Sequence, residues 1–176
     1  MAIQHRQFAV RDNGGGGTSV TVLISTPTAG DRILLSVGWR SDSVTASPPG
    51  AGWTEILPQT TETSADDDLN LQAWEKIATG AEGTSLVVTL SATAKAVAGM
   101  VEFYDDGGLQ MDLDVEGSAQ GTDTTVATST GARSADSYIA GFVTHKNIPA
   151  YTVSGDVPED GRDQTTGDAN STRNRL

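Results

Sequence analysis

Short apolar segments rich in β-branched residues recur along the whole chain, and each is bounded by glycine, proline or aspartate. β-Branched side chains fit the pleated surface of a strand, whereas glycine and proline interrupt helices and favour turns. No long stretch has the apolar spacing of an amphipathic helix. The sequence therefore predicts an all-β protein. The segments that we expect to form strands are 18–25, 32–39, 53–57, 68–78, 84–90, 96–104, 113–117, 124–129, 138–144 and 151–154.

The number and spacing of these segments predict a two-sheet antiparallel β-sandwich with a jelly-roll-like arrangement. A run of four glycines, Gly14 to Gly17, precedes the first of them. The run lacks the lysine of a phosphate-binding loop, so we expect it to act as a flexible hinge. The chain then divides into a flexible N-terminal arm, residues 1–17, and a β-sandwich domain, residues 18–176.

A weak internal repeat bears on the end of the chain. Residues 30–55 resemble residues 135–157, and an acidic loop rich in threonine follows each segment. In this register, residues 173–176 correspond to the start of the strand expected at 68–78. We therefore expect the last strand to be incomplete at the C-terminus. Either the natural chain continues beyond Leu176, or the strand is shortened or supplied by a neighbour.

The balance of charges argues against two classes of partner. The chain has 23 acidic and 11 basic residues, which give a formal net charge of −12. Nucleic acids and anionic lipids are bound largely through lysine and arginine, so we expect neither nucleic acid nor a membrane surface as a partner. No apolar run approaches the about 20 residues that cross a bilayer, so we expect no membrane insertion.

The acids are mostly aspartate (16 of 23) and the bases mostly arginine (8 of 11). This bias has two interpretations. One is the coding bias of a GC-rich genome. The other is adaptation to molar salt, in which surface carboxylates repel one another only weakly because the Debye length falls to about 3 Å.

Few residues suggest catalytic or metal-binding chemistry. The chain has no cysteine and two histidines, which argues against zinc centres. The runs Asp66-Asp67-Asp68 and Asp105-Asp106 would bind Ca²⁺ through carboxylate oxygens, but they lack EF-hand spacing, and solvated acidic turns are the alternative. No G-x-S-x-G segment exposes a nucleophilic serine. We expect no enzyme, no catalytic residue and no cofactor other than this calcium ion.

Three features of the first hundred residues occur in a fixed order: Ser47-Pro-Pro-Gly-Ala-Gly-Trp-Thr54, Ala73-Trp-Glu-Lys-Ile-Ala78 and Ala98 to Tyr104. Their order resembles a β-sandwich module of tailed-phage virion proteins and related bacterial surface proteins, which has a P-x-G-W-T turn, a W-x-K/R-x-A strand and a Y-x-G segment. Here the turn is expanded, and Tyr104 is followed by Asp105-Asp-Gly107. The resemblance covers about residues 18–130. It implies a sandwich fold in a virion or surface setting and carries no catalytic residues.

The tryptophans also have a structural interpretation. We expect Trp53 to enter the core with its indole N–H directed to a nearby carbonyl, and Trp74 to pack against it from the opposite sheet. Trp39, at a strand end beside Arg40, fits either core packing or a ligand-stacking surface.

Two functions from different classes follow. The first is a non-enzymatic structural virion protein that decorates or cements a capsid, or forms an accessory or fibre-like part of a tail. It would contact copies of itself and other virion proteins, such as the major capsid or tail proteins. With the acidic composition, the resemblance suggests a tailed virus of a haloarchaeal host. The alternative is a glycan-binding module for host attachment, with Trp39 or Tyr151 stacking on a sugar of the host surface.

Overall fold

The structure, a computed structural model, describes residues 3–63, 68–105, 141–145 and 171–175. Within these residues every regular element is a strand, and all strand pairs are antiparallel. The all-β prediction is confirmed. The strands of the described residues are β1 (Ile3–Asp12), β2 (Gly17–Leu23), β3 (Arg32–Arg40), β4 (Ala46–Ser47), β5 (Thr54–Glu62), β6 (Leu69–Ile77), β7 (Ser85–Asp105), β8 (Gly141–His145) and β9 (Ser171–Arg175).

Most of the expected strands are present. The predicted segments 18–25, 32–39 and 68–78 match β2, β3 and β6 within about two residues, 53–57 covers the first part of β5, and 138–144 overlaps β8. The segments 84–90 and 96–104 are one continuous strand, β7. The remaining expected strands lie outside the described residues: 113–117, 124–129 and 151–154. The incomplete last strand stays a prediction.

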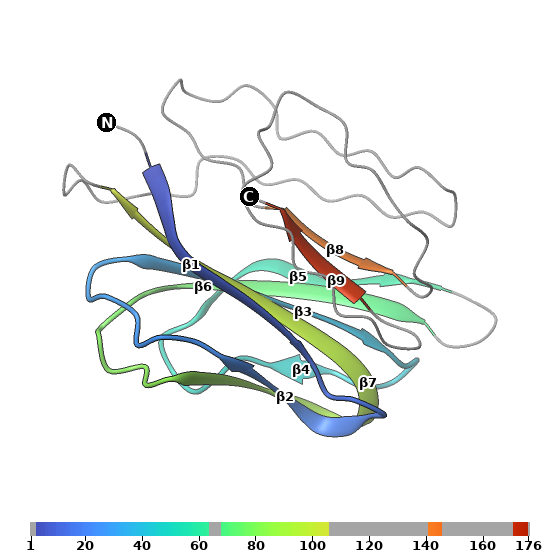
Figure 1. Ribbon diagram of the computed structural model, residues 1–176. Helices are drawn as coiled ribbons and strands as arrows, with labels where there is room; N and C mark the ends of the chain where they lie inside the picture. The colour runs from blue at the N-terminus through green and yellow to red at the C-terminus, as the bar shows by residue number, and fades with distance from the viewer. Residues whose placement is uncertain (1–2, 64–67, 106–140, 146–170, 176) are drawn as a thin grey trace, which may run out of the picture.

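The central strand, β7, pairs with different neighbours in its two halves. Its second half pairs with β1 on one side and β3 on the other, in a five-stranded layer of order β1-β7-β3-β6-β5. Its first half pairs with β2 and β4 in a three-stranded layer. Figure 1 shows the two layers facing each other. Because β7 runs through both, the seven strands form one folded sheet rather than two separate sheets, and the jelly-roll-like sandwich stays a prediction.

The turn between β1 and β2 follows the bend of β7. Asn13 donates its backbone N–H to the carbonyl oxygen of Ala96 at 3.1 Å and its side-chain amide to that of Ala94 at 2.8 Å. Gly14 and Gly16 have positive φ angles of 66° and 125°, which favour glycine. The glycine run therefore forms a tight turn in this structure.

The N-terminal segment differs from the expectation. Residues 3–12, which the sequence places in a flexible arm, pair with residues 97–105 of β7 along almost their whole length. Alternating apolar residues such as Phe8 and Val10 are sufficient to form a strand when the edge of β7 is available for backbone hydrogen bonds. The boundary between an arm and a sandwich domain at residue 17 stays a prediction.

The core lies between the two layers. In β2, Val20 and Val22 are buried while Ser19, Thr21 and Leu23 are exposed, as expected for a strand with one covered face. β3 and β6 and both halves of β7 complete the core. Its side chains include Val20, Val22, Ile33, Leu35, Val37, Trp39, Val44, Trp74, Leu86, Val88, Leu90, Ala98 and Met100.

The opposite face of β3, in the middle of the five-stranded layer, is also covered. Every residue of β3 from Arg32 to Trp39 is buried, so both faces of this strand are shielded from solvent. β8 contacts β3 and β6, and β9 contacts β1 and β7. β8 and β9 pair with each other, and Figure 1 shows this pair of strands on the side of the layer away from β2 and β4. In the part of the chain that the structure describes, no helix has the length and apolar character needed to span a membrane.

Candidate functional site

The structure places Trp39 in the core. Its side chain is 0% exposed, and its indole N–H donates to the carbonyl oxygen of Val44 at 2.8 Å. Sugar rings stack on an exposed aromatic face, and Trp39 offers none in this structure. Tyr151, the other residue expected to stack on a glycan, lies outside the described residues.

The acidic runs are only partly described. Asp66, Asp67 and Asp106 lie outside the described residues, and Asp105 is described as part of β7 without its side chain. Asp68 donates its backbone N–H to Oδ1 of Asp42 at 2.8 Å, which ties the start of β6 to the loop after β3. Among the described residues, no three histidine or carboxylate side chains gather to hold a metal ion. The calcium site stays a prediction.

The proline- and glycine-rich turn holds Trp53 as expected. Its indole N–H donates to the carbonyl oxygen of Pro49 at 2.9 Å, and the ring packs against the core. Its expected relation to Trp74 is wrong. Glu55 of β5, two residues after Trp53, pairs with Trp74 of β6, so the two tryptophans come from one layer and not from opposite sheets.

Lys76 lies between Trp53 and a carboxylate with a buried side chain, Glu82. The ammonium group of Lys76 is 6.0 Å from the centre of the Trp53 ring and 3.1 Å from Oε1 of Glu82. Glu82 also accepts hydrogen bonds from the backbone N–H groups of Thr79 and Gly80. Burial acts to raise the pKa of Glu82, but the hydrogen bonds from Thr79 and Lys76 outweigh it and lower the pKa to about 2.

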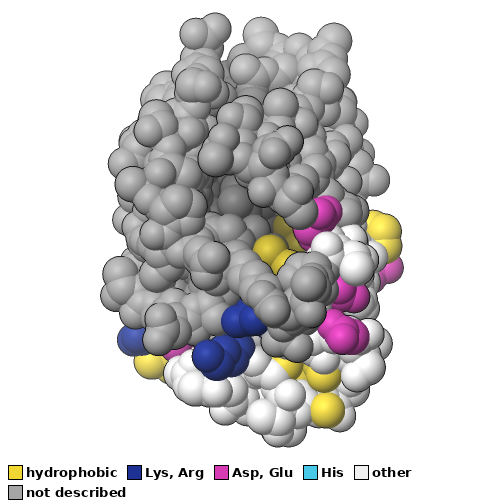
Figure 2. All heavy atoms as spheres, turned by 90° about the vertical axis from the view of Figure 1, so that its right-hand side faces the viewer, with side chains coloured by type: hydrophobic (Ala, Val, Ile, Leu, Met, Phe, Trp, Pro, Cys, Tyr) yellow, Lys and Arg dark blue, Asp and Glu magenta, His cyan; other side chains and the backbone are white. Residues whose placement is uncertain are grey.

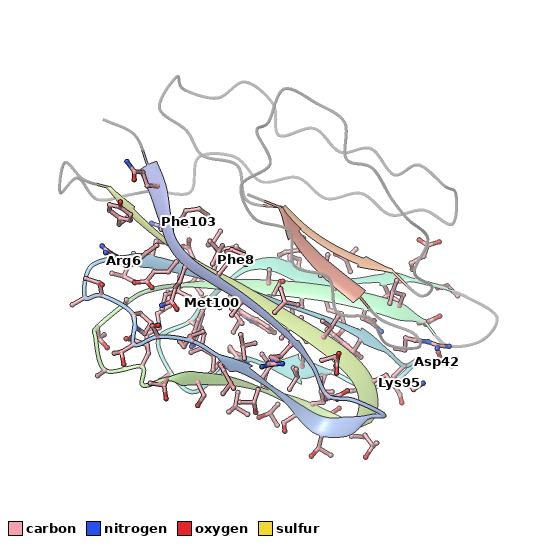
Figure 3. The ribbon with its side chains drawn as sticks, in the orientation of Figure 1. Arg6, Phe8, Asp42, Lys95, Met100 and Phe103 are labelled. Atoms are coloured by element: carbon pink, nitrogen blue, oxygen red, sulfur yellow. The ribbon has the colours of Figure 1, made fainter. Side chains whose placement is uncertain are left out.

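A second buried carboxylate, Glu102, joins three parts of the sheet. Its side chain is 0% exposed, and it accepts hydrogen bonds from the backbone N–H of Thr28 at 2.7 Å and from the side-chain amide of Gln7. Arg6 donates to Oδ2 of Asp31 at 2.6 Å and lies 3.8 Å from Oε1 of Glu102. The Arg6 guanidinium also lies 4.4 Å from the centre of the Tyr104 ring, and Figure 3 shows Arg6 at the end of the five-stranded layer where β1 begins.

Burial is the largest cause of a raised pKa at Glu102. The hydrogen bonds from Gln7 and Thr28 act against it, and the neighbouring carboxylate of Asp31 adds to it. All these partners belong to the chain itself, so the cluster fastens β1 and the loop before β3 to β7. A neutral Glu102 costs less free energy to bury than a charged one, so proton binding by the Glu102 carboxylate is linked to folding.

The sequence alone does not indicate this cluster. Arg6, Asp31 and Glu102 are separated by 25 residues or more, and only the strand pairing, in which His5 and Arg32 both lie opposite Phe103, brings them together. The one sequence feature that points to the cluster is Glu102 itself, because it is an acidic residue between apolar residues of an expected strand.

The outer face of the three-stranded layer carries no charged side chain, and we call it the neutral face. It consists of the exposed residues Ser19, Thr21, Leu23, Thr45, Ser47, Ser85, Val87, Thr89 and Ser91. Leu23 and Val87 are 57% and 40% exposed. Figure 2 shows the lowest part of the described surface mostly white and yellow, with most charged side chains above it.

The strand pairing fixes the neutral face as a regular array. Ser19 lies opposite Thr89, Thr21 opposite Val87, and Leu23 opposite Ser85. Contact with another surface here would bury hydroxyl and aliphatic groups but no charge, which keeps the cost of desolvation low. A comparison of the chain with protein-family models, curated proteins and solved structures finds no match.

Proposed function

We propose that this chain is a non-enzymatic structural protein of a virion, which decorates or cements a capsid or forms an accessory or fibre-like part of a tail. It acts through contacts with copies of itself and with other virion proteins. The observation that carries the proposal is the neutral face, because an array of nine exposed and uncharged side chains is available for packing in a chain with a net charge of −12.

The charge decides where such a protein makes its contacts. Subunits of equal net charge repel one another, and the repulsion is weakest where uncharged surfaces meet. The resemblance of the Pro48 to Thr54 turn and the Trp74 strand to modules of tailed-phage proteins supports the virion setting. In an assembly, symmetry repeats one weak contact many times, so that a small face suffices.

The proposal is tested on purified particles. The chain should co-purify with them, and particles assembled without it should burst at lower temperature if it cements the capsid, or lose a tail structure if it belongs to the tail. Electron microscopy with a labelled antibody separates the two locations. Particles that never contain the chain overturn the proposal. Complete, stable particles that fail only to adsorb to host polysaccharide favour the glycan-binding alternative instead.

A further inference from the structure

The edges of the described sheet are its most direct means of binding another chain. An edge strand presents unpaired backbone N–H and C=O groups that another strand can pair with. Folded proteins block this pairing with charged side chains, proline, bulges or very short edge strands. In the seven-stranded sheet of the described residues, the edge strands are β1 and β5 of the five-stranded layer, and β2 and β4 of the three-stranded layer.

Three of these edges carry such blocks. β1 has exposed Arg6 and Arg11, and its pairing shifts between His5 and Gln7. β5 contains Pro58, and its pairing with β6 shifts twice. β4 is two residues long and is followed by two prolines. Each of these three edges therefore disfavours a continuous ladder with another strand.

The remaining edge, β2, carries none of them between Ser19 and Leu23. Five consecutive residues pair with β7 without a shift, and the run contains neither proline nor a charged residue. Its inward residues Val20 and Val22 are buried, and its outward residues belong to the neutral face. β2 therefore offers a regular, uncharged ladder of about 17 Å.

We propose that a second copy of this chain pairs antiparallel with β2 along this edge, about a two-fold axis at Thr21. The three-stranded layers of both copies then form one continuous six-stranded sheet, and their neutral faces join. The inference rests on the proposed function, because it assigns one of the subunit contacts through which a structural protein acts.

Charge and symmetry favour a second copy as the occupant. A basic partner would be attracted to the acidic parts of the molecule, whereas the neutral β2 edge offers it no attraction. The edge of a second copy is equally uncharged and equally long, and antiparallel pairing of identical strands is self-complementary about a two-fold axis. Five residues bury far less than the about 800 Å² per partner of a standard interface, so we expect a weak dimer that an assembly reinforces.

Cysteine cross-linking tests the geometry directly, because the chain has no cysteine of its own. In the proposed dimer, Thr21 lies opposite Thr21 of the other copy, within the Cα separation that a disulfide bridges. The variant T21C should therefore form disulfide dimers under mild oxidation. Its matched control is V87C, because Val87 is the exposed partner of Thr21 on β7. Two copies of Val87 would lie three strand spacings apart, about 14 Å, which is too far.

A charged substitution tests the energetics. Two lysines directly opposite each other repel, so T21K should raise the dissociation constant of the dimer by up to about fivefold. V87K adds the same charge to the same face away from the edge and should change it much less. Sedimentation equilibrium measures both variants and the unmodified chain over the widest concentration range that solubility allows, with circular dichroism showing that each variant is folded.

Four results overturn the inference. The first is an unmodified chain that stays monomeric in both low and high salt. The second is disulfide cross-linking of V87C but not of T21C, which indicates contact between the faces and not between the edges. The third is dimerisation that T21K leaves unchanged, and the fourth is pairing of β2 only with a strand of another protein. These outcomes are separable from failure of the proposed function. A dimer with the expected behaviour from a chain that is absent from particles overturns only the function, whereas a monomeric chain that resides in particles overturns only this inference.

Discussion

Asn13 and Ala96 exchange two hydrogen bonds. The backbone N–H of Asn13 donates to the Ala96 carbonyl oxygen at 3.1 Å, and the backbone N–H of Ala96 donates to Oδ1 of Asn13 at 3.0 Å. A third bond runs from the Asn13 side chain to the Ala94 carbonyl. The Asn13 side chain thus supplies hydrogen-bond partners to backbone groups of β7 at the point where β7 passes from one layer to the other. It replaces the backbone hydrogen bonds that a continuous neighbouring strand would make there.

Replacing Asn13 by alanine should therefore destabilise the fold. The substitution leaves the Ala96 N–H and the Ala94 carbonyl without their side-chain partner, and we expect a loss of about 1–3 kcal/mol in the free energy of unfolding, measured by urea denaturation. N13D retains the acceptor for Ala96 but places a carboxylate oxygen, which cannot donate, against the Ala94 carbonyl oxygen, so its loss should be at least as large. Equal stability of N13A and the unmodified chain would contradict the role of Asn13 at the bend.

Glu102 should make the folded state more stable in mild acid than at neutral pH. Its pKa is raised in the folded protein, so its contribution to stability is fully present below the unfolded value near 4.5. That contribution is lost as the pH rises through the folded pKa. The urea midpoint of E102Q, which has no charge to bury, should fall less between about pH 4 and pH 8 than that of the unmodified chain. Parallel pH profiles would exclude a titrating Glu102.

Glu82 should act with the opposite sign. Its pKa is lowered to about 2, so the stability it contributes is present above the usual value near 4.5 and is lost as the pH falls through about 2. E82Q should therefore cost about 1–2 kcal/mol at neutral pH, and the difference should vanish in strong acid. Glu55 is an exposed carboxylate on β5, and E55Q serves as the control with little expected effect. Thermal unfolding at several pH values measures all three proteins.

The response to salt distinguishes the two explanations of the acidic composition. Adaptation to molar salt predicts that the thermal midpoint rises steeply between about 0.1 M and about 2 M NaCl, because screening removes the repulsion among surface carboxylates. Differential scanning calorimetry in NaCl is the direct measurement, and the same series in sucrose controls for general solute effects. A flat response would leave coding bias as the explanation of the aspartate and arginine content.

The strands with one or two buried faces could be predicted from the sequence. The apolar run Arg32 to Trp39 and the alternation in 18–25 identify β3 and β2 with boundaries within about two residues. The continuity of β7 could not be predicted in this way. Its middle, Ser91 to Lys95, has no large apolar residue, and it is held as part of a strand by Asn13, about eighty residues earlier in the chain.

The contacts at the surface and at the buried carboxylates depend on register, which local patterns do not give. The glycine run indicated flexibility because glycine permits many conformations, but the same freedom allows the positive φ angles of a tight turn once β1 and β2 are anchored on β7. Trp39 illustrates the same point. From the sequence, a tryptophan beside an arginine fits a binding surface or a core equally well. The hydrogen bond from the Trp39 indole to the Val44 carbonyl, which places Trp39 in the core, depends on the tertiary structure.

The position of β7 in both layers has a consequence for synthesis of the protein. Among the described strands, β1, β2 and β4 find their only partner in β7, which is made after all three, whereas β3, β5 and β6 can pair with one another earlier. As the chain leaves the ribosome, the strands between residues 3 and 23 therefore cannot pair until a strand that ends at Asp105 has been made. Such long-range pairing slows folding, and the uncharged β2 segment is exposed throughout that interval.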